Sequence, residues 1–295
     1  MSSLLPSGAL PLGLGCSRLG SVGGASSTEA RALLLRAWDE GVRVFDTASI
    51  YGQGDSERLL AEALRGREDA TVMSKAGKYL AWHRQLMVPL KGAIRASTRR
   101  SANAKARVAG ARAKQMPTRW DARFLVRSLD GSLSRLRRER IEVFFLHSPP
   151  LEVIASGDAV SALDLARQAG KIGMLGVSAD DSETAMACIA DARVRVLQLP
   201  IQPGATEYRE VVEEAAKAGV LIVAREILGG AKGLVDRRDS QSFARARIIE
   251  MVQHPHITIP LVGATKIETL TASIDAARAG ISPVQGSSDG AAVSG

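Results

Sequence analysis

Two kinds of apolar pattern alternate along this chain. Short runs rich in β-branched residues have the length of buried strands, and the segments between them carry apolar residues at the helical period. The predicted strands cover residues 11–14, 42–46, 71–75, 142–147, 174–177, 194–199, 221–224 and 257–262. The predicted helices cover residues 28–40, 56–65, 122–136, 158–169, 181–190, 207–218, 242–253 and 266–279.

Residues at the ends of the predicted helices support this assignment. Asp180 or Asp181 can cap the helix over 181–190 through its side-chain oxygens. Gly41, Gly170 and Gly219 each follow a predicted helix and precede a strand, where a left-handed residue is favoured. The alternation therefore rests on end signals as well as on periodicity.

Eight strands alternating with eight helices is the count of a (β/α)8 barrel, and 295 residues suffice for one. A doubly wound parallel sheet is the alternative, but no G-x-G-x-x-G motif follows the first strand. We therefore predict an α/β fold, a (β/α)8 TIM barrel that forms a single domain over residues 1–281. Residues 282–295 are rich in Gly and Ser and are predicted to be a disordered tail.

The positive charge is concentrated in residues 76–119, which interrupt the alternation after the third strand. This segment holds eleven Lys and Arg and no acidic residue, so removing those eleven from the 39 basic residues leaves 28 against 31 acidic. A nucleic-acid partner is therefore not expected. We predict a long insertion on the active-site face. It is either a lid, whose Tyr79 and Trp82 line the substrate pocket and whose cations attract an anionic substrate, or a solvated loop.

Composition narrows the class of protein further. The chain is 45% hydrophobic and 24% charged, which is ordinary for a globular protein. Its two cysteines argue against a disulfide framework. No apolar stretch reaches the roughly 18 residues of a membrane span, and the N-terminal segment lacks the basic start of a signal peptide. These features predict a cytoplasmic protein.

Four polar residues lie at or just beyond the ends of predicted strands: Asp46, Tyr51, Lys75 and His147. In parallel α/β folds these strand ends share one face, where catalytic groups collect. An ammonium near a phenol favours the phenolate and lowers the pKa of the phenol, and a carboxylate can hold that ammonium in place. An imidazole can donate a hydrogen bond to a substrate oxygen. The set indicates proton transfer to an oxyanion rather than a metal site, and a reduction would need a bound cofactor.

The segments around these residues resemble the aldo-keto reductases. The matching stretches are FDTASIYGQGDSERLLAEALRG, TVMSKAG, VRSLDGSLSRLRRERIEVFFLHSPP, GKIGMLGVS and IPLVGATKIETL, in the expected order over about residues 10 to 280. The resemblance implies a monomeric enzyme that reduces aldehydes or ketones with NADPH or NADH. It implies that Tyr51 is the general acid, that Lys75 and Asp46 tune it, and that His147 orients the substrate.

The resemblance also implies a set of cofactor contacts, some of which differ from the family pattern. Ser178 fits, but Ala179 stands where the family carries Asn. Gln198 fits, and Arg225 occupies the place of an aromatic residue that stacks on the nicotinamide, which a guanidinium plane can also do. The other implied contacts are Gly15, Cys16, Leu228, Gly229, Gly230, Gly263, Thr265, Lys266 and Thr269.

The stretch IPLVGATKIETL and the residues after it bear on the choice of cofactor. Members that use NADPH usually carry a basic residue, a Glu and an Asn here, and the aligned positions hold Thr269, Ala272 and Ser273. Lys266 could supply the charge from a neighbouring position or could be an exposed residue of the last helix. We predict NADPH, with NADH as the alternative.

Two alternative functions remain. One is a nucleotide-binding regulatory subunit without turnover, and the other is a sugar or natural-product dehydrogenase that uses the same site.

Overall fold

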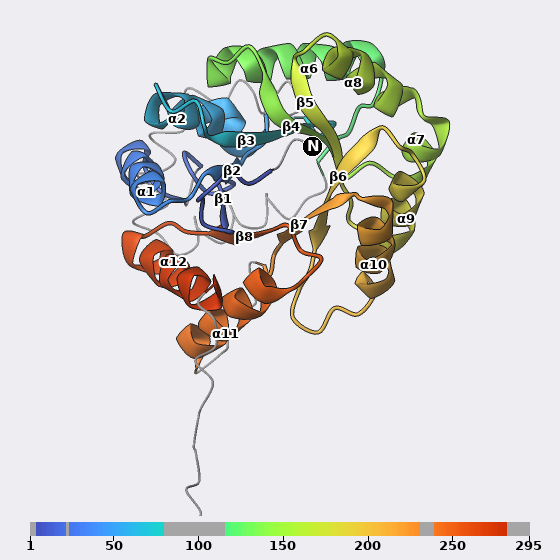
Figure 1. Cartoon of the computed structure of the whole chain (residues 1–295). Helices are drawn as coiled ribbons and strands as arrows, with labels where there is room; N and C mark the ends of the chain where they lie inside the picture. The colour runs from blue at the N-terminus through green and yellow to red at the C-terminus, as the bar shows by residue number, and fades with distance from the viewer. Residues whose placement is uncertain (1–3, 22–23, 80–115, 231–238, 282–295) are drawn as a thin grey trace, which may run out of the picture.

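Eight parallel strands close into a barrel in the computed structural model, which describes residues 4–21, 24–79, 116–230 and 239–281 (Figure 1). The strands follow chain order around the barrel, and β8 pairs with β1 to complete it. The bounds are β1 Gly13–Gly15, β2 Val44–Asp46, β3 Thr71–Ala76, β4 Ile141–His147, β5 Ile172–Ser178, β6 Val194–Pro200, β7 Leu221–Arg225 and β8 Ile259–Gly263. This closure confirms the predicted (β/α)8 barrel and excludes the doubly wound sheet.

Helices surround the barrel and alternate with the strands, as predicted (Figure 1). Their bounds are α1 Ser27–Asp39, α2 Asp55–Ala63, α6 Ala122–Leu136, α7 Leu151–Ser156, α8 Asp158–Gln168, α9 Ser182–Ile189, α10 Arg209–Ala218, α11 Ser240–Gln253 and α12 Ile267–Ile281. In the part of the chain that the structure describes, two further elements were not predicted, the 3-10 helix η1 Tyr51–Gly54 and the short helix α7. Both are too short to show a helical period in the sequence.

The predicted end signals operate in the structure. Asp181 caps α9, because its Oδ1 accepts from the backbone N–H of Thr184 at 2.7 Å. Gly41, Gly170 and Gly219 have φ values of 92°, 80° and 67°, the left-handed region that glycine adopts without strain. These signals set where the helices end and therefore where each strand can begin.

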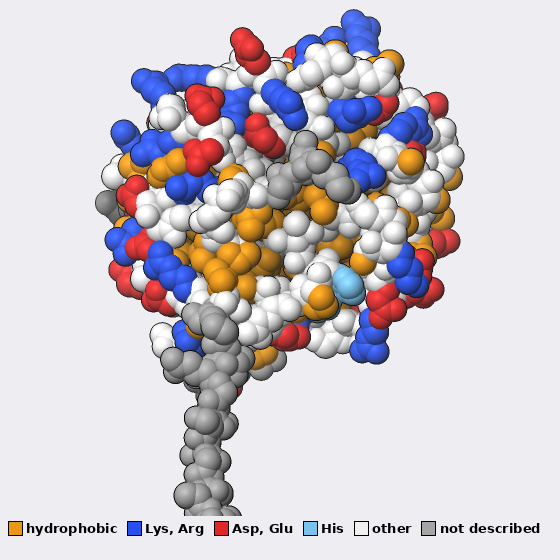
Figure 2. Space-filling model, in the orientation of Figure 1, with side chains coloured by type: hydrophobic (Ala, Val, Ile, Leu, Met, Phe, Trp, Pro, Cys, Tyr) orange, Lys and Arg blue, Asp and Glu red, His pale blue; other side chains and the backbone are white. Residues whose placement is uncertain are grey.

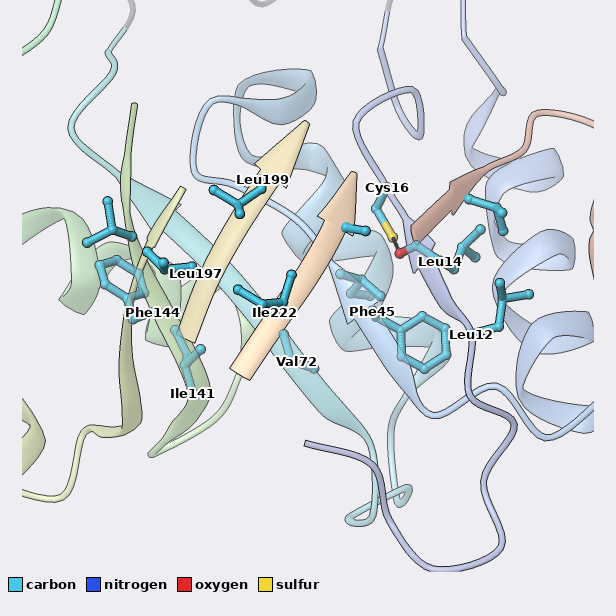
Figure 3. Packing of buried hydrophobic residues seen from close by; sticks show 14 of the residues in the cluster. Leu12, Leu14, Cys16, Phe45, Val72, Ile141, Phe144, Leu197, Leu199 and Ile222 are labelled. Atoms are coloured by element: carbon cyan, nitrogen blue, oxygen red, sulfur yellow. Dashed lines mark hydrogen bonds between the residues drawn. The ribbon is translucent and has the colours of Figure 1, made fainter. Parts of the chain in front are cut away.

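Two apolar layers hold the barrel together. Inside it, Val44, Met73, Val143 and Phe145 pack with neighbours from β6, β7 and β8, and Leu4 closes the layer. Outside it, residues of the opposite parity point toward the helices; Figure 3 shows Leu12, Leu14, Phe45, Phe144 and Leu197 among them. Because side chains alternate between the two faces of a strand, the last inward-pointing residue of each strand reaches the mouth of the barrel.

The surface of the molecule carries charges of both signs. In the view of Figure 2, Lys and Arg side chains are most numerous over α2, α6 and α8, and acidic side chains lie among them. Some cations are paired, as Lys171 is with Asp130 at 2.7 Å and Arg167 with Asp164 at 2.7 Å. None of the helices in the described ranges is long and apolar enough to cross a membrane.

The two ends of the basic segment 76–119 lie side by side. Lys78 and Thr118 form an antiparallel bridge, and the Tyr79 N–H donates to the Pro117 carbonyl at 3.0 Å. Gly77 has a φ of 120°, and a Cβ there would lie 2.1 Å from the Trp120 ring, so only glycine fits. Residues 80–115 lie outside the described residues, as does the predicted tail 282–295, and both predictions stay open.

Candidate active site

The four residues singled out from the sequence come from three neighbouring strands and the turn after one of them. Asp46 ends β2, Lys75 is the last residue but one of β3, His147 ends β4, and Tyr51 begins η1, five residues after Asp46. Asp46, Lys75 and His147 share the parity of Val44, Met73 and Phe145, which fill the barrel interior. The fold therefore directs all three strand residues into the mouth of the barrel.

Asp46 and Lys75 form a buried ion pair. The Lys75 Nζ donates to Asp46 Oδ1 at 2.5 Å and to the Thr47 carbonyl at 2.9 Å, and its side chain is 1% exposed. Burial lowers the pKa of Lys75, while the carboxylate of Asp46 opposes that change. A buried charge needs both a counter-ion and hydrogen bonds, and this pair has both.

Tyr51 and His147 lie beside each other, close to this ion pair. The Lys75 Nζ is 5.4 Å from the centroid of the Tyr51 ring, and the rings of Tyr51 and His147 meet edge to face at 6.0 Å between centroids. His147 is 8% exposed, and its buried Nδ1 has no hydrogen-bond partner among the described residues. The phenol and the imidazole thus lie close enough to contact one substrate oxygen together.

The electrostatics of the site differ from the sequence-based expectation in one respect. We expected Lys75 to lower the pKa of Tyr51, but burial raises the pKa of this phenol well above its usual value, and Asp46 adds to the effect. Lys75 is already committed to Asp46, so the carboxylate offsets its charge. Burial and the charges of Lys75, Lys78 and Arg225 hold the pKa of His147 well below its usual value. At neutral pH the site therefore presents a protonated phenol and a neutral imidazole.

Ser178 and Gln198, two of the implied cofactor contacts, join the ion pair through a chain of buried hydrogen bonds. The Ser178 Oγ donates to Gln198 Oε1 at 3.0 Å, and the Gln198 Nε2 donates to Asp46 Oδ1 at 2.8 Å. Both side chains are buried. Ser178 is the last residue of β5, and Gln198 lies two residues before the end of β6. The chain connects Lys75, Asp46, Gln198 and Ser178 across the mouth of the barrel.

Arg225, at the end of β7, is held by two carboxylates. It pairs with Asp180 and, at 2.5 Å, with Glu226, and it also donates to the Ala179 carbonyl at 3.2 Å. Its charge is near enough to act on the pKa of Tyr51, Lys75 and His147. The guanidinium is thereby fixed beside the four-residue cluster.

The remaining implied cofactor contacts lie at the ends of β1, β7 and β8. Gly15 pairs in register with Asp46 on one side and Gly263 on the other. Thr265 and Lys266 directly precede the fifteen-residue helix α12, and Thr269 lies in its first turn; Lys266 and Thr269 are exposed. Leu228, Gly229 and Gly230 follow β7, both glycines with positive φ. Backbone N–H groups at a helix N-terminus suit the phosphates of a dinucleotide, so the residues before α12 fit the group.

Three predicted site residues remain: Cys16, Tyr79 and Trp82. Cys16 directly follows β1 and is close enough to act on the pKa of Tyr51 and Lys75. The Cys16 thiol is buried in the outer apolar layer, where it donates to the Leu14 carbonyl at 3.4 Å (Figure 3). Its backbone N–H donates to the Asp46 carbonyl. The Tyr79 ring packs edge to face on Phe124 of α6 at 5.7 Å. Trp82 lies outside the described residues.

Three residues of the site were not predicted from the sequence. Lys78 and Ser148 follow the ends of β3 and β4, and the Lys78 Nζ donates to Ser148 Oγ at 2.7 Å. Asp180 holds Arg225 and lies 3.8 Å from the Lys78 Nζ. Their places just past strand ends are the same signal that identified Lys75 and His147. That signal is weak for a lone serine or aspartate, which are common in turns.

Comparisons with known proteins found a matching family model, similar sequences and similar folds. The model of the Aldo/keto reductase family matches residues 11–247. A D-threo-aldose 1-dehydrogenase from a Pseudomonas species is 28% identical over 70% of this chain, and the match spans 62% of that relative's length. A putative aldo-keto reductase from Pseudomonas aeruginosa has a TM-score of 0.72 at 23% identity, over 92% of this chain and 90% of that one. An aldo/keto reductase from Klebsiella pneumoniae, crystallised with NADP and acetate, has a TM-score of 0.67 at 20% identity, over 91% and 86%.

Proposed function

Because the chain belongs to the aldo/keto reductase family, we propose that it reduces an aldehyde or ketone to an alcohol by hydride transfer from NADPH. The observation that carries this proposal is the buried pair of Lys75 and Asp46 beside the Tyr51 phenol and the His147 imidazole. This arrangement supplies a proton donor and a hydrogen-bond donor at one point, which the addition of hydride to a carbonyl carbon requires.

Each residue has a distinct task in this proposal. Tyr51 keeps its proton at neutral pH because burial raises its pKa, so it can donate that proton to the carbonyl oxygen. His147 is neutral and donates a hydrogen bond from one ring nitrogen to the same oxygen. As the Tyr51 proton leaves, the Lys75 ammonium stabilises the phenolate that forms, and Asp46 holds the ammonium in position. The cofactor, when bound, supplies the hydride.

Support for NADPH comes from the family and from the residues at the end of β8. The Klebsiella pneumoniae neighbour was crystallised with NADP. Gly263, Thr265, Lys266 and Thr269 would hold the 2′-phosphate end, and Ser178 with Gln198 would meet the carboxamide. Affinities for NADPH and NADH, measured by calorimetry, should favour NADPH, and Lys266→Ala should narrow that preference. If the ratio of the affinities for NADPH and NADH were the same in the wild type and in Lys266→Ala, Lys266 would not be the phosphate contact.

The experiment that tests the function is turnover of the purified chain with NADPH or NADH and a panel of aldehydes and ketones, followed at the nicotinamide absorbance band. Tyr51→Phe should lower kcat by about 10²- to 10⁴-fold, the usual size of general acid catalysis. Its affinity for NADPH should stay near that of the wild type, since the ring is kept. Tight cofactor binding without turnover of any carbonyl would instead favour a regulatory subunit.

A second candidate is oxidation of sugars by the same site. The Pseudomonas relative, similar over most of this chain, is a D-threo-aldose 1-dehydrogenase. Oxidation uses the same residues in reverse, with the Tyr51 phenolate as the base. Incubation with NADP⁺ or NAD⁺ and a set of aldoses decides between the two directions. Cytoplasmic location and a monomeric state are further proposals, which fractionation and light scattering would test.

A further inference from the structure

Lys78 is a second lysine at the mouth of the barrel, three residues beyond Lys75. Its Nζ donates to the hydroxyl of Ser148 at 2.7 Å, and Ser148 directly follows His147. The charge of Lys78 helps to lower the pKa of His147, which shows that the ammonium lies near the imidazole. The end of β4 therefore positions both the imidazole and this ammonium.

Lys78 lacks the close counter-ion that Lys75 has. Among the described residues, the one carboxylate within 4 Å of its Nζ belongs to Asp180, at 3.8 Å, beyond hydrogen-bond distance. Asp180 also pairs with Arg225, and its side chain is 55% exposed, so water weakens its pull on Lys78. The sequence from Tyr79 to Arg119 contains no Asp or Glu that could serve instead.

The ammonium is nevertheless partly removed from water. The Lys78 side chain is 24% exposed, and its burial lowers its pKa. An ammonium has three N–H donors, and the Ser148 hydroxyl takes one of them. A half-buried cation with donors to spare, beside the groups that would hold a carbonyl oxygen, is the chemistry that binds an anionic oxygen.

Ser148 is held in a backbone conformation that favours this arrangement. Its φ is 57°, the left-handed region, which is uncommon for a residue other than glycine. The Ser148 N–H donates to the Ser178 carbonyl at 2.8 Å, which fixes the turn against β5. Residues in such conformations cluster at active sites. In this conformation the Ser148 hydroxyl accepts a hydrogen bond from Lys78.

We propose that Lys78 is a specificity-determining residue that binds a carboxylate group of the carbonyl substrate while Tyr51 and His147 hold the carbonyl oxygen. This inference rests on the proposed function and adds the substrate class: oxo acids and semialdehydes rather than neutral carbonyl compounds. The substrate carboxylate would take the N–H donors that Ser148 leaves unused. Asp180 then serves to keep the ammonium charged before the substrate arrives.

The test compares acids with neutral amides of the same shape. Glyoxylate, succinic semialdehyde and 4-carboxybenzaldehyde place the carboxylate at increasing distances from the aldehyde, and each has an amide counterpart. At the best distance the wild type should prefer the acid to the amide in kcat/KM by about tenfold or more, the size of a charge-assisted hydrogen bond. Lys78→Met should remove most of that preference, and Lys78→Arg should restore much of it.

Lys171→Met is the matched control, because Lys171 is paired with Asp130 just before β5, at the opposite end of the strand from Ser178. It should leave the ratio of acid to amide unchanged. The inference would be overturned if the ratio of kcat/KM for acid to that for amide were the same in the wild type and in Lys78→Met. It would also be overturned if the wild type preferred none of the acids to its amide. If no carbonyl is turned over, the proposed function fails. Calorimetry of 4-(hydroxymethyl)benzoate with the wild type and Lys78→Met then still decides whether Lys78 binds a carboxylate.

Discussion

Gln198 and Lys75 donate to the same oxygen of Asp46. The Gln198 Nε2 lies 2.8 Å and the Lys75 Nζ 2.5 Å from Asp46 Oδ1, although Gln198 is 152 residues away from Asp46 in the chain. The Gln198 Oε1 also accepts a hydrogen bond from the Ser178 hydroxyl. One buried side chain therefore fixes the carboxylate of the ion pair and a residue of the proposed cofactor site at once.

The Gln198 amide should accordingly be important for stability. Gln198→Met leaves the Asp46 carboxylate with one donor fewer and the buried Ser178 hydroxyl without its acceptor, so we expect a loss of about 2 kcal/mol in the free energy of unfolding. Urea denaturation measures it. Gln202→Met is the control, since Gln202 is exposed and donates to Glu226 at the surface, and it should cost about 0.5 kcal/mol or less. Equal losses in the free energy of unfolding in the two variants would contradict the importance of the buried hydrogen bonds of Gln198.

Tyr51 should remain protonated in alkaline solution. The chain has three tyrosines, and burial raises the pKa of Tyr51 and also raises that of Tyr208 to about 12. The tyrosinate absorbance of the wild type and of Tyr51→Phe should therefore rise equally up to about pH 10.5, close to the pKa of a free phenol. A smaller rise in Tyr51→Phe would mean that Lys75 lowers the pKa of this phenol, as the sequence had suggested.

His147 should make the protein less stable in acid. Its pKa in the folded protein lies well below the value of about 6.5 for a histidine in the unfolded chain, so below that pH the unfolded chain binds a proton that the folded protein does not. The free energy of unfolding should fall as pH drops below about 6.5, by up to about 1.4 kcal/mol per pH unit from this group. Urea denaturation at several pH values should show a shallower dependence in His147→Gln. If the free energy of unfolding fell with pH equally in the wild type and in His147→Gln, His147 would not be a neutral buried imidazole.

Glu57 should be a structural carboxylate behind the site. It is fully buried in α2, where it accepts from the Ser74 hydroxyl at 2.7 Å and from the Arg135 Nε at 2.5 Å. Glu57→Gln removes the charge that Arg135 pairs with, and we expect a loss of about 3 kcal/mol in the free energy of unfolding. Glu62→Gln, an exposed change on the same helix, should cost about 0.5 kcal/mol or less. Similar losses would show that the buried pair contributes little.

The sequence predicted the barrel because its information is local. Apolar runs, capping residues such as Asp181 and glycines such as Gly219 each act within a few residues, so their order specifies eight strand–helix units. It did not predict η1 or α7, which are too short for periodicity and depend on the turns after β2 and β4. The bounds of β1 also differ by two residues at its start, because pairing with β2 and β8 decides where that strand begins.

For the site, the sequence by itself determined that Asp46, Lys75 and His147 lie at the carboxyl ends of successive strands, since strand position and side-chain parity are local properties. Only the tertiary structure decided their electrostatics. Burial depends on what every other segment covers, so it could raise the pKa of Tyr51 although Lys75 lies nearby. Likewise, only closure of the barrel brings Gln198 to Asp46 and Asp180 to both Arg225 and Lys78, contacts between strands that no local pattern encodes.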